Sequence, residues 1–233
     1  MLMTSPPALL FDTYYHIYNR GNNGENIFVQ ERNYTHFLNL LFKYIEPIAN
    51  TFAYCLLRNH FHLAVRIKSE EEILQYLKTQ KKTLKVTSAN QPHNRQTSLA
   101  NPNPDQPGKP LGSNYPSQQF SNFFNAYSKA INTAYGRTGS LFQHPFGRVP
   151  ITNERQFWNV IAYIHQNPQK HKFVEDFRDW KYTSFGILIS DKPTKIQREI
   201  VLDWFGGKQP YLDLHAQWIT EADSKWFAEV DYD

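Results

Sequence analysis

Two runs of strand-forming residues separated by a very short gap constrain the fold of this chain more than any other feature. The runs are residues 51–57 and 61–67, and Arg58 lies in the gap, where a tight hairpin turn would fall. The second run alternates apolar residues with polar ones, and His60 and His62 occupy alternate positions. Side chains two apart on a strand share a face. We therefore expect an antiparallel hairpin with an apolar face toward the core and both imidazoles on the other face.

The remaining pattern alternates strands and helices. Turn residues, helical spacing of apolar side chains and prolines predict a strand at 14–20, helices at 31–45, 69–77 and 119–135, a strand or hairpin at 140–151, and a helix at 154–166 ended by Pro168. The first six elements have the order βαββαβ. This order predicts an α+β, ferredoxin-like (RRM-like) fold, with an antiparallel sheet, helices on one face and a C-terminal helical extension.

The domain organisation is read from changes in composition. Residues 1–187 are predicted to form one domain, and residues 188–233 an acidic C-terminal extension. Residues 86–118 hold six of the 14 prolines and few apolar residues, which predicts a flexible insertion within the domain. Trp180, Trp204, Trp218 and Trp226 are expected to pack against the domain.

Charge and cysteine content limit the class of protein. The whole chain carries +4 and residues 199–233 carry −6, so residues 1–198 carry +10, which suits a polyanion partner as well as an ordinary basic surface. Cys55 is the only cysteine, so no intrachain disulfide can form, and we expect a cytoplasmic protein. No signal peptide and no apolar stretch long enough to span a membrane is visible.

Two short motifs point to chemistry. His60 and His62, side by side on one strand face, suit a divalent metal, although such a pair also occurs without one. Tyr163 and Asn167 are four residues apart, which places them on one face of a helix. A tyrosine can act as a covalent nucleophile and an amide oxygen can bind a metal. The alternative is a packed tyrosine near a helix end, with Asn167 as a cap before Pro168.

A third segment, residues 139–148, combines aromatic and basic side chains. Arg148, together with the nearby Arg137, could hold phosphates, and Phe142 and Phe146 could stack on bases. The alternative is a hairpin whose aromatic side chains lie in the core and whose arginines are solvated.

Five short motifs, in this order, resemble the HUH single-tyrosine transposases, and most of all the REP-associated tyrosine transposases. They are the Asn-Arg-Gly that ends a tyrosine-rich strand (Tyr18–Gly21), Asn-His-x-His-Leu (Asn59–Leu63), Gly-x-Leu-aromatic-Gln (Gly139–Gln143), Tyr-Ile-His-x-Asn-Pro (Tyr163–Pro168) and Trp-x-x-Ser/Thr-Ser-aromatic (Trp180–Phe185). Each motif is short, but the five occur in the right order between about Tyr14 and Phe185.

The resemblance implies specific roles. His60 and His62 would be ligands of Mg²⁺ or Mn²⁺, Asn167 would match the third ligand, and Tyr163 would match the nucleophile. The phenolate would attack single-stranded, hairpin-forming DNA to leave a 5′-phosphotyrosine and a free 3′-OH, which rejoins strands in a second attack. The wider family often has glutamine at the position of Asn167. A homodimer is a further expectation. DNA contacts are expected from Arg20, Arg58, Arg137, Phe142, Arg148, Lys170 and Lys172.

Two other classes of function remain open at this point. A non-catalytic binder of single-stranded nucleic acid could use the same sheet, with Tyr14, Tyr15 and Tyr18 stacking on bases. A zinc hydrolase or structural zinc site could recruit a third ligand such as His144, His165 or His171. Metal-dependent cleavage separates the first rival from the transposase, and a third close ligand would support the second.

Overall fold

The computed structural model describes residues 8–88 and 110–217, with side chains to residue 80 in the first range. Four strands form one antiparallel sheet in the order β2-β3-β1-β4. The strands are β1 (Tyr14–Arg20), β2 (Ala49–Leu56), β3 (His60–Ile67) and β4 (Gly147–Ile151). This order and the connections are those of a ferredoxin-like sheet, so the predicted fold class is confirmed.

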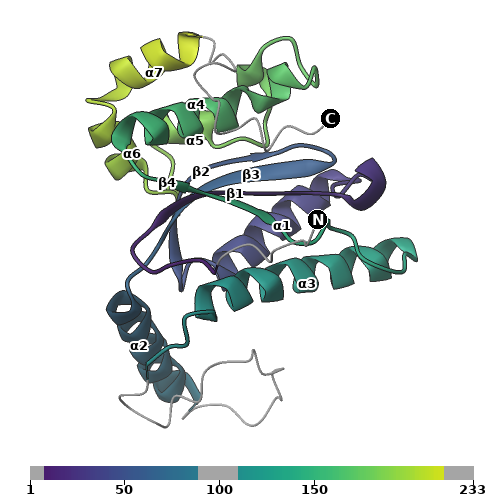
Figure 1. Cartoon of the computed structure of the whole chain (residues 1–233), viewed down its shortest axis with the longest axis vertical. Coiled ribbons are helices and arrows are strands. Elements are labelled where there is room, and N and C mark those ends of the chain that lie inside the picture. The colour runs from purple at the N-terminus through teal and green to yellow at the C-terminus, as the bar shows by residue number, and fades with distance from the viewer. Residues whose placement is uncertain (1–7, 89–109, 218–233) are drawn as a thin grey trace, which may run out of the picture.

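Helices cover both faces of the sheet (Figure 1). The face below the sheet in that view carries α1 (Glu31–Tyr44) and α3 (Tyr115–Tyr135), the two helices of the βαββαβ unit. The opposite face carries α4 (Glu154–Lys170) together with α5 (Phe185–Leu188), α6 (Arg198–Trp204) and α7 (Lys208–Ala216). The long helix α2 (Glu70–Ser88) projects away from the sheet, and 3₁₀ turns occur at Asn22–Gly24 and Phe177–Asp179.

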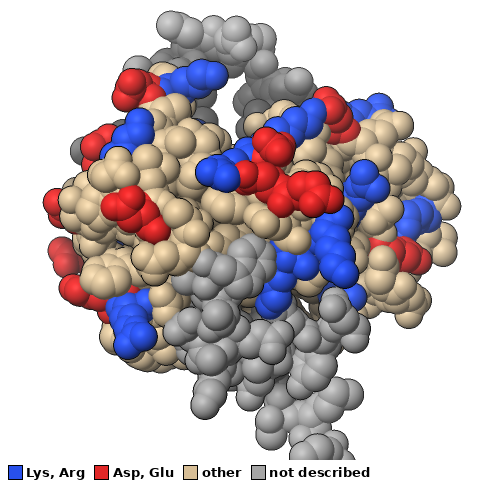
Figure 2. All heavy atoms as spheres, turned by 90° about the horizontal axis from the view of Figure 1, so that it is seen from above, with Lys and Arg blue, Asp and Glu red and all other residues tan. Residues whose placement is uncertain are grey.

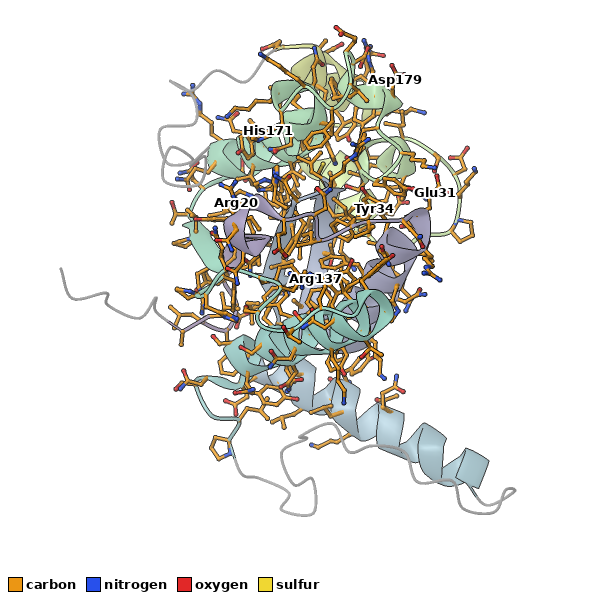
Figure 3. The ribbon with its side chains drawn as sticks, turned by 90° about the vertical axis from the view of Figure 1, so that its right-hand side faces the viewer. Arg20, Glu31, Tyr34, Arg137, His171 and Asp179 are labelled. Carbon is orange, nitrogen blue, oxygen red and sulfur yellow. The ribbon has the colours of Figure 1, made fainter. Side chains whose placement is uncertain are left out.

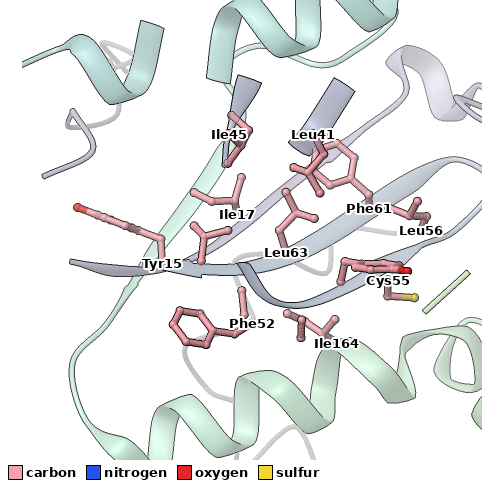
Figure 4. Close-up of a cluster of buried hydrophobic side chains, with 14 of the residues drawn as sticks. Tyr15, Ile17, Leu41, Ile45, Phe52, Cys55, Leu56, Phe61, Leu63 and Ile164 are labelled. Carbon is pink, nitrogen blue, oxygen red and sulfur yellow. The ribbon is translucent and has the colours of Figure 1, made fainter. Parts of the chain in front are cut away.

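The register divides the sheet into two faces. Phe61 and Leu63 of β3 and Ile17 of β1 are fully buried against α1, where Leu41 and Ile45 complete the core (Figure 4). On the other face Phe52 and Ile164 fill the space between the sheet and α4. Because side chains alternate along a strand, His60 and His62 lie on the α4 face, as the sequence predicts.

The ends of the insertion predicted at 86–118 need correction. Val86 to Ser88 belong to α2, and α3 begins at Tyr115, so residues 115–118 are helical. Pro116 is compatible with this start, because a proline in the first turn removes an N–H that has no helical partner. The predicted flexibility of residues 89–109 falls outside the described residues.

Helix α2 is also longer than the short helix predicted at 69–77. Its start is as expected, since the Ser69 hydroxyl accepts from the Glu72 N–H at 3.0 Å and the Glu72 carboxylate accepts from the Ser69 N–H at 2.7 Å. The helix continues through the lysine-rich stretch to Ser88.

The predicted end of α4 is wrong. Pro168 lies inside the helix, which continues to Lys170. The proline removes one backbone donor, but the His171 N–H still bonds to the Asn167 carbonyl at 3.0 Å, and the Phe173 N–H bonds to the Pro168 carbonyl at 2.8 Å. Asn167 is therefore a helical, fully buried residue and not a cap.

The described part of the C-terminal extension is helical and packs on the domain. Trp204 of α6 contacts Tyr14, Phe52 and Phe157, with ring centroids 4.6–6.3 Å apart. Trp180 is half-buried, and its indole N–H donates to the Leu56 carbonyl at 3.0 Å. The packing predicted for Trp218 and Trp226 lies outside the described residues. No helix in the described ranges is both long and apolar enough to cross a membrane.

Candidate active site

Strand β3 and helix α4 bring the two motifs together. His60 and Asn167 are far apart in sequence, but His60 Nε2 lies 3.4 Å from Asn167 Oδ1. The Asn167 amide N–H donates to the Tyr163 carbonyl at 3.3 Å, which turns its oxygen toward His60. The His62 ring centroid lies 5.2 Å from that of His60 and 5.7 Å from that of Tyr163. The predicted pairing of the strand histidines with one face of the tyrosine helix is therefore present.

The His60 ring is oriented by its sequence neighbour. His60 Nδ1 donates to Asn59 Oδ1 at 2.8 Å, since an amide oxygen can only accept. A neutral ring with its proton on Nδ1 has a lone pair on Nε2. His60 Nε2 and Asn167 Oδ1 are then two acceptor atoms that face each other, and both would be available to one divalent cation.

The His62 ring is almost fully buried, with 3% exposure. Its Nδ1 lies 2.9 Å from His16 Nε2, and its Nε2 has no hydrogen-bond partner among the described residues. Burial, followed by repulsion from His16 and His60, holds the pKa of His62 well below its ordinary value. The ring is neutral near pH 7, which is the state that binds a metal.

These observations test whether the residues fit a divalent cation. His60 Nε2 and Asn167 Oδ1 face each other, the His62 ring lies beside that of His60, and the buried Nε2 of His62 has no hydrogen-bond partner among the described residues. Imidazole nitrogens are ligands of first-row transition metals and an amide oxygen suits Mg²⁺ and Mn²⁺, whereas tetrahedral zinc sites take Cys, His and carboxylate ligands. The three residues therefore fit the implied metal. In the described part of the chain, no three His, Cys, Asp or Glu side chains are grouped to hold a metal, which the zinc alternative would require.

Tyr163 stands at right angles to the histidine layer. Its ring meets those of His16 and His62 edge-on, at 5.9 and 5.7 Å between centroids. Lys170, one turn beyond Asn167, holds its ammonium 5.1 Å from the Tyr163 ring centroid. Tyr163 is only 3% exposed.

A second buried network fixes the other side of α4. His165 Nδ1 lies 2.8 Å from His215 Nε2 of α7, and His165 Nε2 lies 2.8 Å from the Ser184 hydroxyl. The Tyr54 N–H of β2 in turn donates to Ser184 Oγ at 2.9 Å. Helix α4 is thus tied to the sheet through Ser184 and to α7 through His215. This gives the Trp-x-x-Ser/Thr-Ser motif and the histidine of Tyr-Ile-His-x-Asn-Pro a structural role.

The basic residues proposed to contact DNA are spread over the molecule. Arg20 pairs with His60 in the β1–β3 register, and Arg58 is exposed in the hairpin turn. Arg20 and His171, whose ring lies 4.7 Å from that of His60, are on the same side of the molecule (Figure 3). Lys170 and the exposed Lys172 follow the tyrosine helix. These side chains lie near the histidines or the end of α4.

Two predicted arginines are placed differently. Arg148 lies on the face opposite His60, where its guanidinium stacks 3.8 Å above the Phe146 ring and donates to the Ser117 hydroxyl at 3.3 Å. Arg137, beyond the end of α3, is ion-paired with Glu25 (Figure 3). On the face around α4 to α7, Lys and Arg are interspersed with Asp and Glu (Figure 2).

The prediction that Phe142 stacks on bases is wrong. Its side chain is 1% exposed and packs against Phe61, Phe124 and Tyr127 in the core. Phe146 is also buried, beneath Arg148. The aromatic residues of this segment support the sheet, which is the alternative that the sequence left open.

The tyrosines of β1 do not form an open stacking platform. Tyr15 faces the core on the α1 side and is buried. Tyr14 packs between Phe52, Phe157 and Trp204. Because α4 and α6 cover this face of the sheet, the surface that an RNA-recognition sheet offers to bases is occupied by protein.

Sequence reasoning missed two participants in the site. His16, fully buried on β1, contacts both His62 and Tyr163. Tyr18, two residues on, lies over both His16 and His62, with ring centroids 5.3 and 6.1 Å away. Their alternation along β1 was a signal, but it became informative only with the register that pairs β1 with β3.

Comparison with known proteins supports the motif reading. No protein-family model matches the chain. A putative REP-associated tyrosine transposase of Haemophilus influenzae is 37% identical over 49 residues, which is 21% of this chain and 28% of that protein. The solved structure of a REP-associated tyrosine transposase bound to a REP hairpin superposes with a TM-score of 0.53 at 14% identity, over 83% of this chain and 89% of that one. The chain resembles the REP-associated tyrosine transposases.

The two comparisons contribute different information. The sequence match covers little more than a quarter of the Haemophilus influenzae protein. The structural match has low sequence identity, so it supports the fold alone. Within that fold, four of the motifs lie on β1, β3, α4 and the segment that follows α4, whereas the motif at Gly139–Gln143 follows α3 and places Phe142 in the core on the opposite face. The residues, rather than the overall similarity, therefore carry the functional argument.

Proposed function

We propose that this protein is a metal-dependent tyrosine transposase that cuts and rejoins single-stranded, hairpin-forming DNA. The observation that carries the proposal is the convergence of His60 Nε2 and Asn167 Oδ1 at 3.4 Å beside His62 and Tyr163. The likeness to the solved structure of a REP-associated tyrosine transposase bound to a REP hairpin supports DNA hairpins as the substrate class.

The chain's own groups would share the work as follows. Tyr163 Oη forms a bond to the scissile phosphorus, the bond from phosphorus to the 3′ oxygen breaks, and the 3′ oxygen leaves as a hydroxyl. The phenol loses its proton in this step, and the product is a 5′-phosphotyrosine. A divalent cation, Mg²⁺ or Mn²⁺, held by His60, His62 and Asn167 would supply electrophilic activation of the phosphate. Attack by a 3′-OH on the phosphotyrosine reverses the step and rejoins DNA without ATP.

Lys170 has two possible uses in this scheme, and both follow from its place over the Tyr163 ring. Its positive charge stabilises the phenolate as the phenol proton leaves. It also attracts the DNA backbone toward the nucleophile. Because Tyr163 is nearly buried, the DNA must displace a covering side chain to reach the hydroxyl.

The test is adduct formation on a denaturing gel. The full chain is incubated with labelled single-stranded hairpin DNA in Mn²⁺ or in EDTA, beside Tyr163→Phe. The matched control is Tyr115→Phe, which removes a phenol hydroxyl at the start of α3, on the opposite side of the sheet. We expect a denaturation-resistant adduct that needs metal, is lost in Tyr163→Phe and persists in Tyr115→Phe.

Two outcomes would contradict the proposal. An adduct of undiminished yield in Tyr163→Phe would exclude this residue as nucleophile. No adduct across a broad panel of hairpins, combined with tight DNA binding, would favour a non-catalytic nucleic-acid-binding protein. A homodimer, in which one protomer's tyrosine works beside its partner's histidines, is part of the proposal that the same gel tests when Tyr163→Phe and His60→Ala chains are mixed.

A further inference from the structure

His62 has a partner that no motif assigns. His62 Nδ1 and His16 Nε2 are 2.9 Å apart, and both side chains are buried, His16 completely. Two neutral imidazoles at this distance share one proton, which one ring donates and the other accepts. The contact therefore sets the protonation pattern of both rings.

Only one of the two possible arrangements suits a metal ligand. If His62 Nδ1 donates to His16 Nε2, the remaining nitrogen of His62, Nε2, keeps its lone pair. If His16 Nε2 donates instead, neutral His62 carries its proton on Nε2. That nitrogen is then an N–H donor and cannot bind a cation, so only the first arrangement leaves a lone pair on His62 Nε2 for a metal.

The strand register explains how His16 reaches His62. His16 lies directly opposite Ala64, and His62 lies opposite Tyr18, so the two histidines are diagonal neighbours on one face. The small Ala64 side chain leaves space for the His16 ring to lean toward His62, with ring centroids 5.1 Å apart. The Tyr18 ring covers both imidazoles.

The arrangement parallels that of the other histidine. His60 donates its Nδ1 proton to Asn59 Oδ1, and His62 would in the same way donate its Nδ1 proton to His16 Nε2. Partners that accept the second ring proton of a metal-binding histidine fix its tautomer and raise its basicity, and their loss costs about 10–100-fold in metal affinity.

We propose that His16 is a positioning residue whose Nε2 accepts the Nδ1 proton of His62 and so holds the Nε2 lone pair of His62 available for a divalent cation. The role of His16 in metal binding rests on the proposed function. The tautomer of His62 can be measured whether or not the protein cleaves DNA.

The first measurement is ¹⁵N NMR of the full, metal-free chain labelled at histidine, with the His62 signals assigned by their loss in His62→Gln. We expect protonated Nδ1 and unprotonated Nε2 in His62. In His16→Met, which removes the acceptor, we expect the two His62 tautomers to mix. A wild-type His62 protonated on Nε2, or a tautomer unchanged in His16→Met, would overturn the proposal.

The second measurement is Mn²⁺ affinity by titration in the absence of DNA. His16→Met should bind Mn²⁺ about 10–100-fold more weakly than wild type. His16→Gln places an amide oxygen near the position of Nε2 and should restore most of the affinity. His215→Gln, a substitution of a buried histidine on the far side of α4, is the matched control and should bind as wild type does. Equal weakening in Gln and Met variants would mean a packing role only, against the proposal.

The two proposals fail in different ways. If the wild type never forms a DNA adduct, the proposed function fails, while the NMR tautomer still decides the role of His16. If the adduct forms but His62 is protonated on Nε2, the function stands and the role of His16 is refuted.

Discussion

Two pairs of buried histidines lie on opposite sides of helix α4, and they differ in one respect. His16 and His62 lie between α4 and the sheet, and His165 and His215 lie between α4 and α7. In both pairs a ring nitrogen of one residue is 2.8–2.9 Å from a ring nitrogen of the other. In the first pair His62 Nε2 has no hydrogen-bond partner among the described residues. In the second pair both nitrogens of both rings are bonded.

The second pair belongs to a chain of hydrogen bonds with one direction. The Tyr211 carbonyl must accept, so His215 Nδ1 donates to it at 2.7 Å, and His215 Nε2 accepts from His165 Nδ1. His165 Nε2 then accepts from the Ser184 hydroxyl, whose oxygen accepts from the Tyr54 N–H. The Ser184 hydroxyl also lies 3.3 Å from the Tyr54 carbonyl, and the Tyr211 hydroxyl lies 3.3 Å from His165 Nδ1. All four ring nitrogens of this pair are therefore hydrogen-bonded within the protein.

The difference separates two uses of a buried histidine. A closed network stabilises one packing arrangement of three elements, because each polar group is satisfied only in that arrangement. An open pair holds one atom ready for a group from outside. Burial and histidine content are alike in the two pairs, so the unpartnered atom, and its nearness to His60 and Asn167, is what indicates a site.

The largest expected effect is on adduct formation, and it concerns the side of α4 where His16 and His62 lie. His60→Ala removes a partly exposed side chain that is a proposed metal ligand, and we expect metal-dependent adduct formation to fall about a thousand-fold, since electrophilic activation supplies several kcal/mol. The melting temperature should change little. The control is His144→Ala, an exposed loop histidine. If His144→Ala lost as much activity as His60→Ala, the comparison would lose its meaning.

Substitutions in the fully hydrogen-bonded pair, His165 and His215, should lower the free energy of unfolding. His165→Ala deletes a fully buried ring and leaves His215 and Ser184 without their partners, so we expect the free energy of unfolding to fall by about 3 kcal/mol in urea titrations. Mn²⁺ affinity of the folded protein should stay near wild type. A loss below about 0.5 kcal/mol, the size of an ordinary surface change, would show that the network does not brace α4.

A third substitution displaces the Tyr18 ring, which lies over His16 and His62. A Cβ at Gly147 would lie 2.0 Å from the Tyr18 ring, so Gly147→Ala must move the ring that lies over His16 and His62. We expect about 2 kcal/mol of destabilisation in urea titrations and weaker Mn²⁺ binding. Gly112→Ala is the control, because a Cβ there meets nothing within 4 Å. Equal stability of the two variants would contradict the contact.

The smallest effect is a gradual dependence of stability on pH. Burial lowers the pKa of His165 well below 6.5 and that of His215 to about 4, so the unfolded chain binds more protons than the folded one between these values. Stability should be complete above pH 6.5 and fall as the pH decreases toward about 4. Urea titrations at several pH values should show a shallower fall in His215→Gln. An equally steep fall in that variant would assign the dependence to other groups, such as His62.

Much of the fold could be predicted from sequence because its signals are local. The alternation in residues 61–67 and the helical spacing of α1, α3 and α4 each reflect a single element packing on a core. The end of α4 could not be predicted in this way. Proline ended the helix by local rules, whereas burial of Asn167 and Pro168 against the sheet keeps the last turn helical.

The site was predictable only where its residues lie in short motifs. The motifs named His60, His62, Tyr163 and Asn167 as candidates, and only the fold shows that these four residues lie close together. His16 was missed because its contact with His62 depends on the register between β1 and β3. Phe142 was misassigned because the same sequence pattern, an aromatic residue close to arginines, occurs where the ring stacks on bases and where it packs in a core. Ser184 and His215 gain a role only through α4, which no local pattern reveals.

The position of α2 and α3 bears on how the protein can be labelled. Helix α2 and helix α3 lie on the side of the sheet away from α4 (Figure 1). A fluorescent protein inserted in the connection between these two helices would therefore be attached on that side, opposite the helix that carries Tyr163. DNA binding could then be followed by the fluorescence of the fused protein, without a label at either chain terminus.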